Sequence, residues 1–213
     1  MNRKESYAPN QLPLASDRAQ APAPATRLSR SAFFADFYVY PFFAVVFVAL
    51  SLAWDPRRWR ASVLAVVVGF AVWTFVEYLL HRFVLHHVKW VKDQHDVHHH
   101  DQKALVGTPT WFSFLVFLAF VTMPAILATD LEVGVSFTAG MMLGYLWYVT
   151  AHYGIHHWQA KSSGYLGRLK RRHALHHHYD DLGNFGVTSG IWDHVFRTNL
   201  NPRTRGGPGL EQT

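Results

Sequence analysis

Four long apolar runs constrain the fold of this chain more than any other feature of its sequence. The runs cover residues 33–54, 61–80, 111–129 and 133–153. Each can form a helix that crosses a bilayer, because about 20 apolar residues span the ~30 Å hydrocarbon layer. Short polar links, residues 55–60 and residues 130–132, join the runs in pairs. We therefore predict an all-α integral membrane protein with four transmembrane helices in two hairpins.

Lysine and arginine are distributed unevenly around these runs. With four crossings, both ends of the chain and its central polar segment fall on one side, which holds 17 of the 20 basic residues. Basic residues accumulate on the cytoplasmic side of membranes, so we predict that this face is cytoplasmic. The aromatic residues lie inside the apolar runs, so we expect lipid and not nucleic acid as the anionic partner of this basic chain.

Composition divides the chain into three parts. Residues 1–32 are rich in Ala, Pro and charge, and we expect a disordered N-terminal tail. Residues 33–200 form the predicted membrane domain, whose first run reads as an anchor without an evident cleavage site. Residues 201–213 are expected to be a flexible C-terminal tail. The chain has no cysteine, which excludes disulfides and thiolate metal sites.

Histidine is the second unusual feature. Fourteen of the 15 histidines lie between His81 and His178, in four clusters. Residues three or four apart share a face of a helix, so each cluster can direct several imidazoles the same way. His81 and His86 are five apart and do not align on an α-helix, so we expect a helix end or a kink between them. The spacing selects ten candidate metal ligands: His81, His86, His95, His98, His99, His152, His156, His173, His176 and His177.

The remaining histidines have weaker signals. His87, His100, His157 and His178 adjoin candidate ligands, and they are either solvated or supporting residues. His194 stands alone between aromatic residues and is predicted to be structural.

Ten imidazoles are too many for one zinc ion, because a structural zinc takes four ligands and a catalytic zinc usually three plus water. Two metal ions with about five ligands each suit iron with one open position. We predict a cap of His-rich helices on the cytoplasmic side that holds a di-metal centre of two iron ions. Zinc can replace iron in recombinant material. The sequence contains no zinc-protease motif and no nucleophile elbow.

Glu77 lies one turn before His81 inside an apolar run. Two interpretations remain open: a partner of a metal ligand that orients its imidazole, or a helix-end acid satisfied by Arg82 or lipid. Residues 180–198 are expected to form a loop and a short helix that close over the site.

A two-iron centre at a bilayer indicates activation of dioxygen, as co-substrate, and insertion of an oxygen atom into a lipid C–H bond. A metal transporter is the alternative from another class, but its ligands should lie near the bilayer midplane, whereas these gather at one face.

Several motifs carry a resemblance to a known family. They are Glu77-Tyr78-Leu79-Leu80-His81, His95-x-x-His98-His99, His152-Tyr153-x-x-His156, His173-x-x-His176-His177, and Phe185-Gly186-Val187-Thr188-Ser189-x-x-Trp192-Asp193. Over about residues 60–198 the chain resembles the fatty acid hydroxylase/sterol desaturase superfamily, most closely the catalytic domain of fatty acid 2-hydroxylases.

The resemblance implies a fatty acid hydroxylase-like membrane domain, an O2-dependent di-iron monooxygenase in lipid biosynthesis, and the ligand role for the ten histidines. The implied substrate is a fatty acyl lipid, with the 2-position as one candidate. A sterol or carotenoid hydroxylase or desaturase is the alternative within the superfamily. Eukaryotic relatives often carry an N-terminal haem cytochrome domain, whereas residues 1–32 contain no histidine. We therefore expect a separate electron-donor protein.

Overall fold

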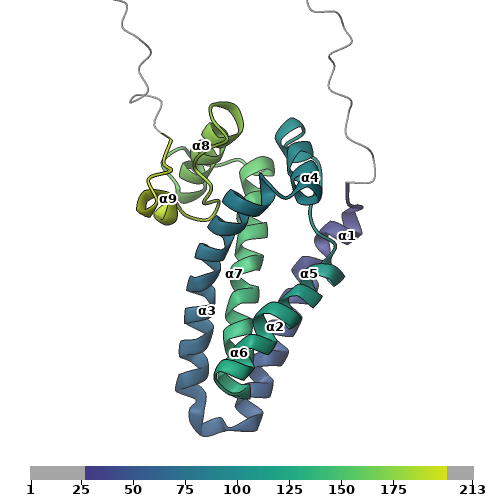
Figure 1. Ribbon diagram of the computed structural model, residues 1–213, viewed down its shortest axis with the longest axis vertical. Helices are drawn as coiled ribbons and strands as arrows, with labels where there is room; N and C mark the ends of the chain where they lie inside the picture. The colour runs from purple at the N-terminus through teal and green to yellow at the C-terminus, as the bar shows by residue number, and fades with distance from the viewer. Residues whose placement is uncertain (1–26, 201–213) are drawn as a thin grey trace, which may run out of the picture.

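The computed structural model describes residues 27–200, and its regular elements are helices (Figure 1). Within this described part, the only β pairing is an isolated bridge between Arg27 and Val106. Four helical stretches are long and apolar enough to cross a membrane: Arg30–Trp54, Pro56–Leu85, Thr110–Ala128 and Leu131–His157. The prediction of an all-α protein with four membrane helices is therefore confirmed.

The first hairpin contains α1 (Arg30–Phe34), α2 (Asp36–Trp54), η3 (Pro56–Arg58) and α3 (Trp59–Leu79). Asp55 makes the turn, because its side chain accepts a hydrogen bond from the backbone N–H of Arg57 at 3.0 Å. Beyond α3 the helix continues as a π-helical stretch, η4 (Leu80–Leu85). The second hairpin contains α5 (Thr110–Phe117), the π-helical η5 (Leu118–Thr122), α6 (Met123–Ala128) and α7 (Leu131–His157).

The turns of the two hairpins are joined by ion pairs. The guanidinium of Arg58 lies 2.8 Å from Asp130 and 3.1 Å from Glu132. Asp130 also begins α7, since its side chain accepts a hydrogen bond from the backbone N–H of Val133 at 2.9 Å. The basic link and the acidic link thus hold the two hairpins together at the end far from the histidines.

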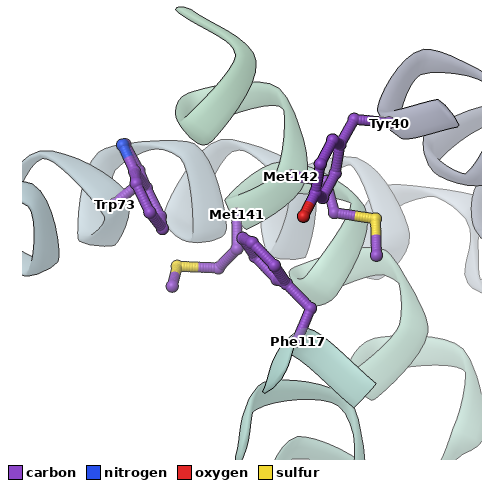
Figure 2. Packing of buried hydrophobic residues seen from close by; sticks show 5 residues of the cluster. All are labelled: Tyr40, Trp73, Phe117, Met141 and Met142. Carbon is purple, nitrogen blue, oxygen red and sulfur yellow. The ribbon is translucent and has the colours of Figure 1, made fainter. Parts of the chain in front are cut away.

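Apolar side chains fill the interior of the helical bundle and also lie on its outer surface. Tyr40, Trp73, Phe117, Met141 and Met142 form the buried cluster in Figure 2. On the outer surface, Leu64 is 63% exposed and Phe120 is 75% exposed. An outer surface of this kind suits contact with lipid acyl chains, which agrees with the assignment of four membrane spans.

Helices α3 and α7 approach each other closely because both carry glycine at the crossing. A Cβ atom on Gly69 would overlap the carbonyl oxygen of Phe137, and one on Gly140 would overlap that of Val66. Small residues at such positions allow membrane helices to pack backbone against backbone. This crossing brings the cap-side ends of α3 and α7 together.

Three helices form a cap at one end of the bundle (Figure 1). They are α4 (Lys89–His100), α8 (Tyr165–His178) and the short α9 (Ile191–Val195). The segment between α8 and α9 is irregular, as expected for residues 180–198.

The structure differs from the prediction in the last residues of the expected N-terminal tail. Residues 1–26 of that tail, and the predicted C-terminal tail 201–213, lie outside the described residues. Residues 27–32, however, are ordered. The backbone N–H of Leu28 donates to the carbonyl of Leu105 at 2.8 Å, and Ser29 caps a helix that begins at Arg30. Pairing with a distant segment therefore orders polar residues that local composition assigns to a tail.

Candidate metal centre

The ten candidate histidines come from four regions of the chain and meet in the cap. η4 and its end supply the first pair, α4 the next three, the end of α7 two, and α8 the last three. Eight of them form two groups, within each of which the potential ligand nitrogens lie within 4.8 Å of one another. Group A is His81, His86, His95 and His176, and group B is His98, His152, His156 and His173.

The other two histidines lie where the groups meet. The Nε2 atom of His99 is 3.0 Å from that of His95 in group A. The Nε2 atom of His177 is 2.9 Å from that of His173 in group B. The rings of His99 and His177 stack with centroids 4.2 Å apart. All ten histidines therefore belong to one continuous cluster.

A π-helical turn explains how His81 and His86 share a group. Hydrogen bonds in a π-helix run between residues five apart, so such residues lie nearly above one another. The two rings stack with centroids 5.2 Å apart and planes 17° from parallel. The irregularity expected between these residues is thus a widened turn, and the helix does not end until Leu85.

Nε2 atoms face each other at the centre of each group. In group A the Nε2 atoms of His81 and His95 are 3.2 Å apart, and those of His86 and His176 are also 3.2 Å apart. His81 donates its Nδ1–H to the carbonyl of Phe185, and His176 donates its Nδ1–H to that of Gly183. These rings therefore present Nε2 lone pairs to the centre, and converging lone pairs are the donor set that a cation needs.

Burial keeps the imidazoles of His86, His98 and His99 neutral. Burial, with nearby histidines adding to it, lowers the pKa of His98 to about 3 and that of His99 to about 4. The same two causes lower the pKa of His86 to about 4. Neutral imidazole is the form that binds metal ions, so these residues are ready to act as ligands at pH 7. The residues present fit a pair of metal ions.

Glu77 contacts the loop before α9 and not an imidazole directly. Its carboxylate accepts hydrogen bonds from the backbone N–H groups of Val187 and Thr188 at 2.7 and 2.8 Å. The hydroxyl of Thr188 donates to it at 2.7 Å. The same loop supplies the carbonyl of Phe185 that orients His81, so Glu77 reaches the cluster through the loop.

A cavity of about 220 Å³ lies beside the cluster on its membrane side. His81, His95, His98, His152 and His156 are in its wall. A second cavity, of about 750 Å³ and mostly apolar, runs between the membrane helices. Six residues line both: Trp73, Leu80, Leu85, Val91, Thr108 and Tyr145. The cavity beside the imidazoles therefore adjoins the apolar cavity between the membrane helices.

Two buried acids were given no role by sequence reasoning, although one of them, Asp193, stands in a quoted motif. Asp36 is 6% exposed, lines the smaller cavity, and accepts hydrogen bonds from Thr110 and Tyr145, both at 2.5 Å. The sequence did contain a signal for Asp36, since it is the single acidic residue in the first apolar run. Asp193 is fully buried and accepts hydrogen bonds from the N–H groups of Phe185 and Gly186. Its role depends on a loop conformation that the sequence pattern does not encode.

The histidines outside the selected ten belong to neither group. His87, His100, His157, His178 and His194 are all exposed. The Nε2 atom of His178 accepts a hydrogen bond from the side-chain amide of Gln102 at the surface. The spacing of the histidines thus separated clustered from exposed rings.

Comparison with known proteins finds related sequences and a similar fold. The profile of the family described as fatty acid hydroxylase matches residues 66–198, more than half of the chain. Ceramide very long chain fatty acid hydroxylase SCS7 of Saccharomyces cerevisiae is 35% identical over 148 residues, which are 63% of this chain and 38% of that protein.

Other relatives agree. Fatty acid 2-hydroxylase of Rattus norvegicus is 34% identical over 145 residues, 62% of this chain and 38% of that protein. Dihydroceramide fatty acyl 2-hydroxylase FAH1 of Arabidopsis thaliana is 37% identical over 144 residues, 62% of this chain and 59% of that protein. The chain therefore matches about two fifths of the length of the yeast and rat relatives.

Among solved structures, full-length scs7p, in which only the hydroxylase domain is visible, superposes with a TM-score of 0.69 at 25% identity. The match covers 84% of this chain and 69% of that one.

Proposed function

The chain belongs to the fatty acid hydroxylase family, and from this premise we propose that it hydroxylates a C–H bond of a fatty acyl lipid, using two iron ions and dioxygen. Carbon 2 of the acyl chain is the proposed position, since relatives named above are fatty acid or fatty acyl 2-hydroxylases. The proposed ligands are the ten clustered histidines. The proposed reaction is a step in lipid biosynthesis.

One observation carries this proposal: ten imidazoles converge in one cluster, and the cavity beside them shares wall residues with an apolar cavity between the membrane helices. A soluble metal site has no need of such an apolar cavity. A transporter needs polar groups along a path across the bilayer, whereas here the metal-binding groups gather at one end. An acyl chain in the apolar cavity would place one of its ends beside the imidazoles.

Bound iron would supply the activation of dioxygen that a C–H bond requires. The chain itself supplies the remaining parts. Neutral imidazoles hold the two sites, and the shared wall residues Trp73, Leu80 and Tyr145 surround the acyl chain and exclude water. This arrangement selects which carbon lies nearest the cluster, because the rings and the apolar cavity are both fixed to α3 and α7.

We propose that the cap faces the cytoplasm, because the basic residues gather on that side of the four spans. Electrons would then reach the cluster from a separate donor protein that approaches the cap. A cysteine introduced at the exposed Lys161 should react with a membrane-impermeant maleimide only after the cells are opened. Reaction in intact cells would place the cap on the other side.

Lipid mass spectrometry tests the activity. Cells that express this chain should contain acyl lipids heavier by one oxygen atom, and fragmentation should locate that oxygen at carbon 2. His173→Ala should abolish the product, while His194→Ala, which changes an exposed histidine, should leave it unchanged. A product lighter by two hydrogen atoms would mean desaturation. Oxygenated lipid formed equally by His173→Ala would contradict the proposed site.

A further inference from the structure

Groups A and B differ in the hydrogen bonds at the outer nitrogen of some of their rings. In group A, His81 and His176 donate their Nδ1–H groups to the carbonyls of Phe185 at 2.6 Å and Gly183 at 2.8 Å. In group B, the Nδ1 atom of His173 is buried and has no hydrogen-bond partner in the described part of the chain. The same is true of His177, which adjoins group B.

The carbonyls that serve group A are themselves held in place. Asp193 accepts hydrogen bonds from the N–H groups of Phe185 and Gly186, both at 2.9 Å. Glu77 accepts hydrogen bonds from the N–H groups of Val187 and Thr188, as described above. Asn184 has a left-handed backbone, with φ of 55°, and its side chain donates to the carbonyl of Arg172. The N–H of Asn184 donates to the carbonyl of Thr198 at 2.9 Å, so every backbone N–H from residue 184 to residue 188 is hydrogen-bonded.

Two buried carboxylates thus act on group A through the loop. Glu77 is 3% exposed and Asp193 is fully buried, and Asp193 also pairs with the guanidinium of Arg172 at 2.9 Å. Anchoring from α3 on one side and α9 on the other prevents the carbonyls from turning away. The rings of His81 and His176 consequently keep their tautomer and direction before any metal ion arrives.

We propose that the two metal sites are unequal: group A binds its cation more tightly, and group B releases its cation first. The inference rests on the ligand assignment of the proposed function. An outer hydrogen bond fixes the direction of a ligand ring and raises its basicity, and loss of such a bond typically lowers metal affinity by roughly 10- to 100-fold. Glu77 and Asp193 are positioning residues for group A.

Zinc binding by the purified full chain in detergent tests the inequality without any turnover. Protein is dialysed against a series of buffered free-zinc concentrations, and bound zinc is measured by inductively coupled plasma mass spectrometry. As the free-zinc concentration is lowered, the two ions should leave in two steps. The free-zinc concentrations at the midpoints of these steps should differ by roughly 10-fold or more. Release of both ions in one step would overturn the inference but leave the proposed function intact. Failure to bind any zinc would count against both.

Single ligand variants identify the site that holds the retained ion. The His173→Ala variant, changed in group B, should still bind one zinc ion with the tighter midpoint. The His176→Ala variant, changed in group A, should lose this tighter binding step. The opposite pattern would overturn the inference. Gel filtration and helical circular dichroism show whether each variant retains its fold.

A glutamate variant keeps all ten histidines and so tests the loop itself. Glu77→Gln should weaken the tighter step by roughly 10-fold and leave the weaker step unchanged. The matched control is Glu132→Gln, because Glu132 is also buried, at 6% exposure, but pairs with Arg58 at the opposite end of the bundle. Equal effects of the two variants, or an effect of Glu77→Gln on the weaker step alone, would overturn the role of the loop.

Discussion

The Nδ1 atom of His81 lies 2.6 Å from the carbonyl oxygen of Phe185, 104 residues later in the chain. The ring of His81 comes from the end of a membrane helix, and the carbonyl comes from the loop between α8 and α9. This bond makes the C-terminal loop part of the metal centre, although the loop contains none of the ten histidines. The residues that hold this loop in place should therefore affect both metal binding at the centre and the stability of the cap.

Asp193→Asn should destabilise the cap strongly. The carboxylate is fully buried and receives hydrogen bonds from two backbone N–H groups, Thr198 and Arg172. Removal of its charge leaves Arg172 without its ion-pair partner, and we expect a loss of about 2–3 kcal/mol of unfolding free energy. Thermal unfolding in detergent, followed by circular dichroism, measures the effect. Asp93→Asn is the control, since Asp93 makes an exposed pair with Lys89 and should change stability by less than about 0.5 kcal/mol.

Gly140→Ala should force α3 and α7 apart. The added methyl group would overlap the backbone of Val66, which cannot move aside without shifting the whole helix. We expect a loss of about 1–3 kcal/mol, typical of overpacking. At Gly107 the added Cβ atom would lie 3.7 Å from a side-chain carbon of Leu28, so Gly107→Ala should be tolerated. Equal melting temperatures for the two variants would show that the crossing is less tight than the structure indicates.

Tyr145→Phe should loosen the contact between α2 and α7. The phenol of Tyr145 donates to Asp36 at 2.5 Å, and without it the buried carboxylate keeps only the hydrogen bond from Thr110. An unmet buried acceptor costs about 1–3 kcal/mol. Tyr38→Phe removes the same hydroxyl from a side chain that is 77% exposed and should have no measurable effect. Comparison of the two unfolding curves checks the prediction.

The metal-free protein should lose stability as the pH falls from 6.5 toward 4. In the folded chain, burial and nearby histidines hold the pKa of His86 and His99 at about 4, below the ordinary histidine pKa of about 6.5. Between these values the unfolded chain binds protons that the folded chain does not, so unfolding becomes easier as the pH is lowered. Above pH 6.5 both forms are neutral and the contribution of these residues is constant.

Melting temperatures at pH 7.5, 6.0 and 5.0 measure this dependence. His99→Gln removes one titrating ring and should make the decline shallower than in the unchanged chain. A decline that is equally steep in the variant would show that other groups cause it.

Local features of the sequence were sufficient for the membrane spans and for the choice of clustered histidines. Apolar run length predicts a membrane helix without knowledge of its neighbours, because the hydrocarbon layer has a set thickness. Helical periodicity likewise predicts which side chains of one helix share a face, which is why His95, His98 and His99 were selected together. Both inferences use only residues close together in the chain.

The division of the histidines into two groups was decided by tertiary structure. His95 and His98 are on the same helix, yet they belong to different groups, because the partners of each ring come from other helices. The close glycine crossing of α3 and α7, the widened turn at Leu80–Leu85 and the course of the loop at Phe185 set those partners. Composition and periodicity describe one helix at a time, whereas the meeting of rings depends on distances between helices.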